Sequence, residues 1–105
     1  MNESIAEKKA SIFTALGHAN RIRILEFLRY GEKCVCEIHP ELGLEQSNLS
    51  RHLRALSQAG LLQSRRQGVS IYYRISDPRV FEVIDAAAHI VKDRLLQEAK
   101  LAKKI

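Results

Sequence analysis

Two cysteines and one histidine are the residues of this chain best suited to bind a metal ion or to be oxidised. Cys34 and Cys36 stand one residue apart, and His39 follows three residues later. Thiolates bind soft ions such as trivalent arsenic and antimony, cadmium, lead and zinc, whereas imidazole suits zinc or cadmium better than arsenic. The same thiols could instead oxidise or take up reactive sulfur. A lone Cys-x-Cys pair is weak evidence for either chemistry, because free cysteine often packs as a small buried hydrophobic residue and His39 before Pro40 could serve only as a turn residue.

The spacing of these residues constrains the backbone that can bring them together. Residues two apart lie about 200° apart around a helix, so Cys34 and Cys36 can grip one ion only from extended or distorted backbone. Cys36 and His39, three apart, share a helical face. Pro40 disfavours helical backbone at His39 and removes a helical hydrogen bond. We therefore expect a marginal helix over about residues 34–42 whose first turn unwinds when both thiolates capture an ion.

The size and composition of the chain indicate a single small domain, of 105 residues, with a formal net charge of +5. No apolar run approaches the 18 or so residues of a membrane span, so we expect a soluble, cytoplasmic protein. In that compartment the two thiols are expected to stay reduced, without a structural disulfide. No set of nucleophile, base and orienting residue is evident, so an enzyme is not expected.

One stretch, from Gln46 to Ile75, carries the whole net charge. It contains five arginines and no acidic residue, whereas the rest of the chain has twelve basic and twelve acidic side chains. Basic residues on a solvated face are usually mixed with acids, so this separation favours a surface that faces a polyanion. We expect the partner to be nucleic acid.

The first part of the chain has helical periodicity. Apolar spacing predicts helices over about residues 4–16, 18–30, 34–42 and 46–58, the first with a capping box formed by Ser4 and Glu7. The third and fourth helices meet at a glycine turn, which is typical of a helix-turn-helix.

The fourth helix has two different faces at 100° per residue. One is apolar and formed by Leu49, Leu53 and Leu56. The opposite face carries hydroxyl, guanidinium and amide groups, from Ser47, Ser50, Arg51, Arg54 and Gln58. His52 flanks the leucine face and is interpreted as a packed or capping histidine.

The remaining residues predict a hairpin and a long helix. Strands over about 62–66 and 70–75 flank the turn signal Gln67-Gly68, and a helix follows over about 78–101, with Asp85 and His89 expected to pair on its surface. This last helix has more apolar surface than one small core needs. We therefore expect it to form a homodimer interface with the helix over 4–16, the alternative being that both helices only cover the monomer core.

The order of elements and the residues themselves resemble the ArsR/SmtB family of metalloregulatory repressors. The resemblance spans about residues 5–95, and its most specific parts are Gln46 to Leu53 (QSNLSRHL), Ala59-Gly60-Leu61, and the hairpin with Arg65-Arg66, Gly68 and Tyr72-Tyr73. It implies a mainly α fold with a β-hairpin wing, a winged helix-turn-helix in the order α-α-α-α-β-β-α. It also implies a homodimer that binds double-stranded operator DNA when unliganded and needs no cofactor to do so.

The resemblance assigns roles to the basic stretch. Residues of the fourth helix would read base edges in the major groove: Gln46, Ser47, Ser50 and Arg51. Arginines at its flank and on the hairpin would contact phosphates: Arg54, Arg65 and Arg66. Gly68 would let the hairpin tip approach the minor groove. Two departures from the family pattern are Glu45, a weak helix cap beside DNA, and a hairpin tip that lacks a basic residue.

The resemblance also gives the cysteines a role. A Cys-Val-Cys box stands before the recognition helix in the arsenic-, cadmium- and lead-responsive branch, and one arsenic-sensing type has a third cysteine where this chain has His39. It implies a metal site of Cys34, Cys36 and a third ligand at His39, induced by arsenite or antimonite, with cadmium, lead or zinc as further inducers. Two alternatives stay open: a repressor of the same fold that senses oxidants or reactive sulfur, and a winged-helix interaction module that does not bind DNA.

Overall fold

The computed structural model describes residues 2–104 of the chain, which form five helices and three strands. In chain order these are α1 (Ile5–Leu16), α2 (Ala19–Phe27), β1 (Lys33–Cys34), α3 (Val35–Leu42), α4 (Gln46–Gln58), β2 (Leu62–Gln67), β3 (Ser70–Ile75) and α5 (Val80–Lys103). The predicted winged helix-turn-helix architecture is confirmed, with β1 as an additional strand.

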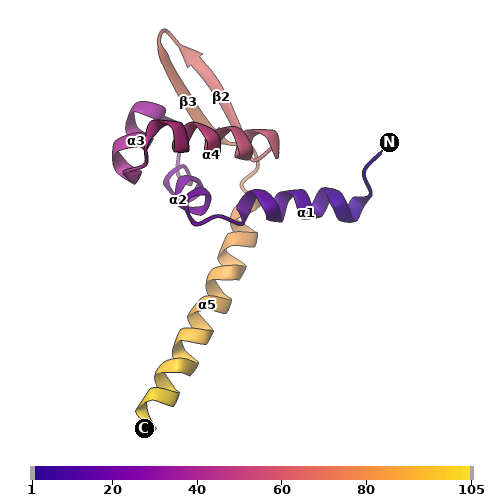
Figure 1. Ribbon diagram of the computed structural model, residues 1–105, viewed down its shortest axis with the longest axis vertical. Helices are drawn as coiled ribbons and strands as arrows, with labels where there is room; N and C mark the ends of the chain where they lie inside the picture. Colours follow the sequence, from indigo (N-terminus) through magenta and orange to yellow (C-terminus); the bar gives the residue numbers. More distant parts are fainter. Residues whose placement is uncertain (1, 105) are drawn as a thin grey trace.

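The core lies where α2, α3, α4 and the start of α5 meet. Helix α2 is central, as its wide apolar arc predicts, because Ile24, Leu25 and Leu28 are all at most 1% exposed. Ile38 of α3 and the three leucines of α4 pack against it, so the helix-turn-helix is built directly on the core. In Figure 1, α4 crosses the base of the hairpin, and the hairpin projects beyond the helices.

The turn between α3 and α4 depends on Gly43. This residue ends α3 in the left-handed conformation, with φ of 65°, and its N–H donates to the carbonyl of His39. A side chain at this φ would be strained, which explains why glycine stands there. Helix α4 has the predicted bounds, and Glu45 at its N-cap makes no side-chain capping bond, as expected of a weak cap.

Three antiparallel strands form the sheet, in the order β1-β3-β2. The hairpin of β2 and β3 turns at Gly68, whose φ is 63°, and Lys33 and Cys34 pair with Tyr73 and Tyr72 on the other edge of β3. Strand β1 has only two residues, so its own sequence carries no strand pattern. It forms because β3 pairs with it, and it connects the segment that carries Cys34 and Cys36 to the hairpin.

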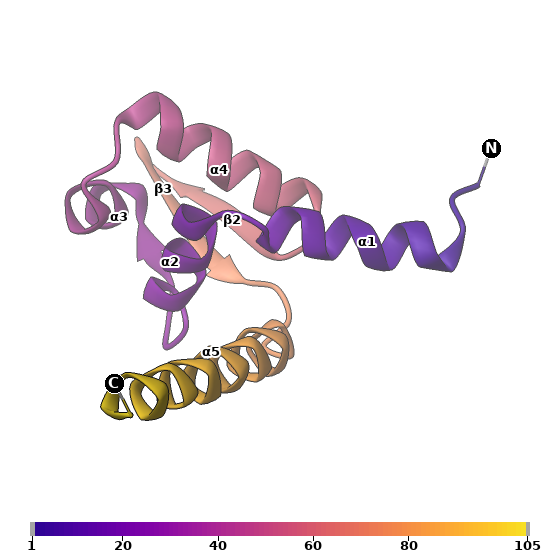
Figure 2. The same cartoon turned by 60° about the horizontal axis from the view of Figure 1, so that its bottom comes forward.

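Helices α1 and α5 extend away from the core, as both views show (Figures 1 and 2). Helix α1 begins with the predicted capping box of Ser4 and Glu7. Helix α5 begins two residues later than expected, because Pro78 and Arg79 form a turn and the Asp77 carboxylate binds Arg79. Both helices carry exposed apolar side chains, among them Phe13 at 62%, Leu95 at 59% and Leu96 at 53% exposed. No helix of the described residues is long and apolar enough to cross a membrane.

An ion pair connects the first turns of α5 to the turn that follows α2. Both terminal guanidinium nitrogens of Arg29 donate to the carboxylate of Asp85, at 2.8 and 2.6 Å, and the guanidinium also lies over the ring of Phe81. These hydrogen bonds lower the pKa of Asp85 from its usual value. The expected surface pair between Asp85 and His89 is therefore wrong, because the fold brings Arg29 to this carboxylate from a distant part of the sequence.

Candidate nucleic-acid interface and cysteine site

The polar face of α4 is presented to solvent as predicted. All four residues expected to read bases, Gln46, Ser47, Ser50 and Arg51, are exposed, and so is Arg54. The opposite face is buried, with Leu49, Leu53 and Leu56 at most 2% exposed. Arg51 donates to the side-chain oxygen of Asn48 at 2.5 Å, which orients the guanidinium along the helix. This face can therefore enter a major groove without loss of core contacts.

The three arginines expected at phosphates differ in their surroundings. Arg54 and Arg66 are exposed, and neither forms an ion pair within residues 2–104. Arg65 instead binds Glu32, which lies outside the acid-free stretch, with an N–O distance of 2.6 Å. The hydrogen bonds lower the pKa of Glu32 and raise that of Arg65, so both groups stay charged. Sequence reasoning missed Glu32, since no local pattern marks a carboxylate whose partner is 33 residues away.

Cys34 and Cys36 are joined by a disulfide, with Cα atoms 5.0 Å apart. The expectation of two separate reduced thiols is therefore wrong for this structure. The physical reason is local: Cys34 is the N-cap of α3, with extended backbone at φ −71° and ψ 146°, and is not part of the helix. Its sulfur accepts the N–H of Cys36 at 3.0 Å, while Glu37 accepts the N–H of Cys34 and completes a capping box.

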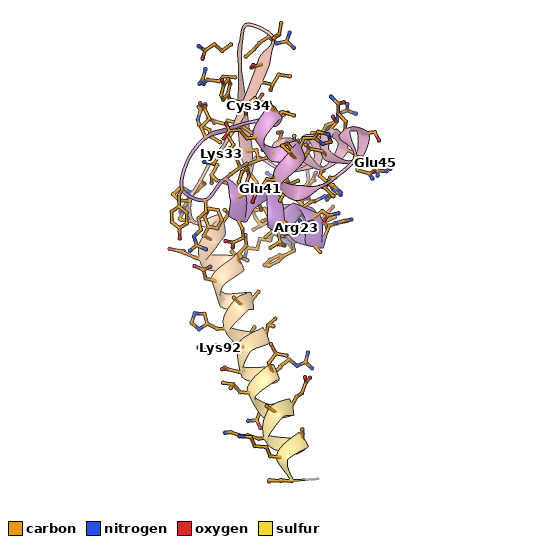
Figure 3. All side chains as sticks on the ribbon, turned by 90° about the vertical axis from the view of Figure 1, so that its left-hand side faces the viewer. Arg23, Lys33, Cys34, Glu41, Glu45 and Lys92 are labelled. Carbon is orange, nitrogen blue, oxygen red and sulfur yellow. A yellow bond between two sulfur atoms is a disulfide. The ribbon has the colours of Figure 1, made fainter. Side chains whose placement is uncertain are left out.

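This geometry also corrects the expected unwinding of α3. The two sulfurs meet although α3 is intact from Val35 onward, so the helix need not open for both to reach one atom. The two cysteines differ in access, because Cys34 is 3% exposed and Cys36 is exposed. Figure 3 shows Cys34 at the point where α3 meets the hairpin.

A pocket of about 420 Å³ opens beside the cysteine pair. Its lining comes from three elements: Cys34, Val35, Cys36 and His39 at α3, Gln46 at the start of α4, and Val69, Ser70 and Ile71 at the hairpin. A group attached to the sulfurs there would lie beside the start of α4 and the hairpin. This pocket could not be predicted from the sequence, since its lining residues are distant along the chain.

The third predicted ligand, His39, is exposed at this pocket. Within residues 2–104 no three side chains of the metal-binding types are grouped so that they could hold an ion. The two sulfurs can supply two bonds to a thiophilic atom once they are reduced. A third ligand at His39 stays a prediction that needs a movement of its side chain.

His52 is packed inside the helix-turn-helix and is 5% exposed. Its Nδ1 accepts a hydrogen bond from Nε of Arg21 at 3.2 Å, and its ring lies 4.4 Å from that of His18. Burial lowers its pKa, and the charges of His18, Arg21 and Arg51 lower it further. The interpretation of His52 as a packed histidine is confirmed.

A buried leucine face, an exposed polar reading face and a flanking hairpin together define a winged helix-turn-helix of the DNA-binding regulator class. Residues 18–64 match the family described as "Bacterial regulatory protein, arsR family". The chain is 39% identical to Rv0081 of Mycobacterium tuberculosis, whose crystal structure superposes with a TM-score of 0.75 over 92% of this chain and 97% of that one.

Two further proteins show the same relationship. The homodimeric winged helix-turn-helix DNA-binding domain Mb0332 of Mycobacterium bovis is 32% identical, with a TM-score of 0.74 over 90% of this chain and 86% of that one. The arsenic resistance transcriptional regulator ArsR1 of Pseudomonas putida is 42% identical over 78% of this chain and 64% of its own length.

The chain therefore belongs to the ArsR family of bacterial regulatory proteins. It is a winged helix-turn-helix transcriptional repressor, and the expectation that it is not an enzyme is confirmed by this membership.

Proposed function

We propose that this protein is a homodimeric repressor that binds a near-palindromic operator and releases it when Cys34 and Cys36 react with an inducer. The observation that carries the proposal is the pocket in which both cysteines lie beside Gln46 of the recognition helix and Ile71 of the wing. Chemistry at the sulfurs is thereby in contact with both elements that face DNA. Such a repressor acts in the cytoplasm, where the DNA is.

DNA binding is assigned to the exposed face of α4 and to the wing. Gln46, Ser47, Ser50 and Arg51 would read base edges. Arg54 and Arg66 would contact phosphates, and Gly68 would let the hairpin tip approach the minor groove. Arg65, also predicted at a phosphate, is held by Glu32 in the DNA-free protein.

The dimer interface is assigned to α1 and α5. Apolar side chains of both helices are exposed in the single chain, and a groove between α2 and α5 is lined by Ile22, Ile84, Val91 and Leu95 among others. A second copy would cover this surface. The homodimeric Mb0332 domain supports the assignment, since it shares this fold.

Arsenite or antimonite is the inducer that we propose first. Two thiolates in a single pocket suit a soft metalloid, and cadmium, lead and zinc are further candidates. Support comes from the similarity to the P. putida arsenic resistance regulator. A relative named as a probable mercury resistance operon repressor, from Streptomyces lividans, is 32% identical over 80% of this chain, so thiophilic metals more generally suit the family.

One observation favours a second inducer class. The two sulfurs already form a disulfide in an undistorted α3, so the pair is well placed for reversible oxidation, for example by polysulfide. In that reading the disulfide would be the induced state and the dithiol the DNA-binding state.

A titration on DNA separates these inducers. Reduced protein, bound to a duplex that it selects from randomised DNA, is treated in parallel with arsenite, antimonite, cadmium, zinc and polysulfide. Release by arsenite or antimonite supports the metalloid assignment, and release by polysulfide alone refutes it. Cys34→Ser and Cys36→Ser should keep DNA affinity and lose release, whereas release that survives both substitutions places the sensing site elsewhere.

A further inference from the structure

We propose that Glu32 and Arg65 form a clamp that links the cysteine segment to the wing, and that Arg65 positions the wing instead of anchoring a phosphate. This inference rests on the proposed function, in which chemistry at Cys34 controls DNA binding. It adds a residue, Glu32, to which neither DNA binding nor sensing has so far given a role.

The contacts of Arg65 occupy most of its donors. Its Nε donates to both carboxylate oxygens of Glu32, at 3.0 and 2.9 Å, and a terminal nitrogen donates to the same carboxylate at 2.6 Å. The other terminal nitrogen donates to Gln67 at 2.8 Å. The guanidinium also lies over the ring of Tyr72, 4.4 Å from its centroid. Arginine suits such a site because its planar group binds a carboxylate and stacks on an aromatic ring together.

The clamp spans the whole width of the sheet. Glu32 directly precedes β1, Arg65 belongs to β2, and Tyr72, which lies beneath the guanidinium, belongs to the central strand β3. Tyr72 is also the residue that pairs with Cys34. The two outer strands are thus connected over the middle one, at the register of the buried cysteine.

A phosphate at Arg65 would have to displace or tolerate this carboxylate. Both carboxylate oxygens of Glu32 accept hydrogen bonds from Arg65, and a carboxylate in that place would repel a phosphate at close range. Arg66, the next residue, is exposed and makes no ion pair within the described residues. The wing therefore offers Arg66 to DNA and uses Arg65 internally.

The clamp could pass a movement of the cysteine-bearing strand β1 on to the hairpin. A change of the Cys34 sulfur, through a bond to a metalloid or through the disulfide, acts on β1, which is held by only two residue pairs to β3. The Glu32–Arg65 pair extends that hold to β2, so a shift of β1 moves the hairpin as one body. Without the clamp, β1 can move while the hairpin stays.

The test compares Glu32→Gln, Arg65→Gln and Arg66→Gln with Glu41→Gln, which removes one carboxylate from an exposed position of α3. DNA affinity is measured at several salt concentrations for reduced protein, and again after arsenite and after oxidation to the disulfide. We expect Arg66→Gln to reduce the salt slope by about 1 per subunit and Arg65→Gln to leave it unchanged. Glu32→Gln and Arg65→Gln should both bring the ratio of affinities before and after treatment close to unity, and Glu41→Gln should keep the wild-type ratio.

A salt slope lowered by Arg65→Gln as much as by Arg66→Gln would overturn the inference, and so would a full response in both clamp variants. A second readout needs no DNA: amide hydrogen exchange of β2 and β3 in the reduced and the disulfide forms. The difference between the two forms should be present in wild type and Glu41→Gln but absent in Glu32→Gln. Failure of the wild type to bind or release DNA would refute the proposed function, whereas equal exchange differences in all variants would refute the clamp.

Discussion

Helices α4 and α5 are both amphipathic, but only α4 has its apolar face covered by its own chain. Its leucines at positions 49, 53 and 56 are at most 2% exposed, whereas Val91, Leu95 and Leu96 of α5 are more than half exposed. The first turns of α5 are the exception, since Phe81 and Ile84 reach the core and Asp85 binds Arg29. An apolar stripe therefore shows that a helix packs, but it does not show whether the partner is the same chain.

The largest effect that distinguishes the two helices should come from Leu56→Ala. This side chain is fully buried in the hydrophobic core, so its truncation leaves a cavity and should cost about 2–5 kcal/mol of the free energy of unfolding. Urea denaturation followed by circular dichroism measures the loss. A loss below about 1 kcal/mol would mean that α4 is held chiefly by contacts other than its leucine face.

On α5 the corresponding change should affect association instead. Leu95→Glu places a carboxylate in the groove between α2 and α5 and should weaken the homodimer by at least about 100-fold, or about 2.8 kcal/mol. Sedimentation equilibrium measures the dissociation constant, and the helix content should be kept. Gln97→Glu, about 200° around the helix, is the matched control. If Leu95→Glu remains as dimeric as Gln97→Glu, the dimer uses another surface.

Helix α4 shows which features can be predicted from the sequence of one segment alone. The bounds of α4 follow from its leucine period and its flanking glycines, so Gln46–Gln58 was predictable. The polar face with Ser47, Ser50, Arg51 and Arg54 followed from the same period, because the leucine face lies in the core and leaves the opposite side to solvent. The assignment of Gln46 and of base reading came only from the family resemblance and stays a prediction.

Features that depend on a distant partner were not predictable. Strand β1 exists because β3 pairs with it, and Cys34 is an extended N-cap because that pairing holds it outside α3. The same pairing brings the two sulfurs together, which the expected helix over residues 34–42 would have prevented. Glu32 neutralises Arg65 across three strands, so the acid-free stretch is basic in sequence but partly compensated in the fold.

Arg51→Ala should have a smaller effect, which is confined to DNA binding. Arg51 is exposed on the reading face, so its removal should cost about 1–3 kcal/mol of binding free energy and relax the preference for one base pair. Fluorescence anisotropy with the selected duplex and its single-base variants measures both effects. Arg94→Ala on α5 removes the same charge away from the reading face and should change neither. Equal losses on every duplex would make Arg51 a phosphate contact.

The smallest effect concerns a histidine on each helix, His52 of α4 and His89 of α5. His52 is buried and its pKa is lowered, chiefly by burial, so the folded protein binds a proton there less readily than the unfolded chain. As the pH falls below the usual histidine value of 6.5, the unfolded chain gains protons first, and the folded state loses stability until the lowered pKa is reached. A proton on Nδ1 would also end the hydrogen bond from Arg21.

His52→Gln keeps an acceptor for Arg21 but cannot titrate, so it should flatten the dependence of the free energy of unfolding on pH between about 7.5 and 5.5, a window above the range of ordinary carboxylates. His89→Gln, an exposed position on α5, is the control and should keep the wild-type slope. Thermal melts at four pH values in this window measure the slopes. If His52→Gln and His89→Gln give the same slope, the loss of stability in mild acid does not originate in the core behind the recognition helix. If only His52→Gln is flat, the loss of stability in mild acid comes from the buried histidine on which the recognition helix rests.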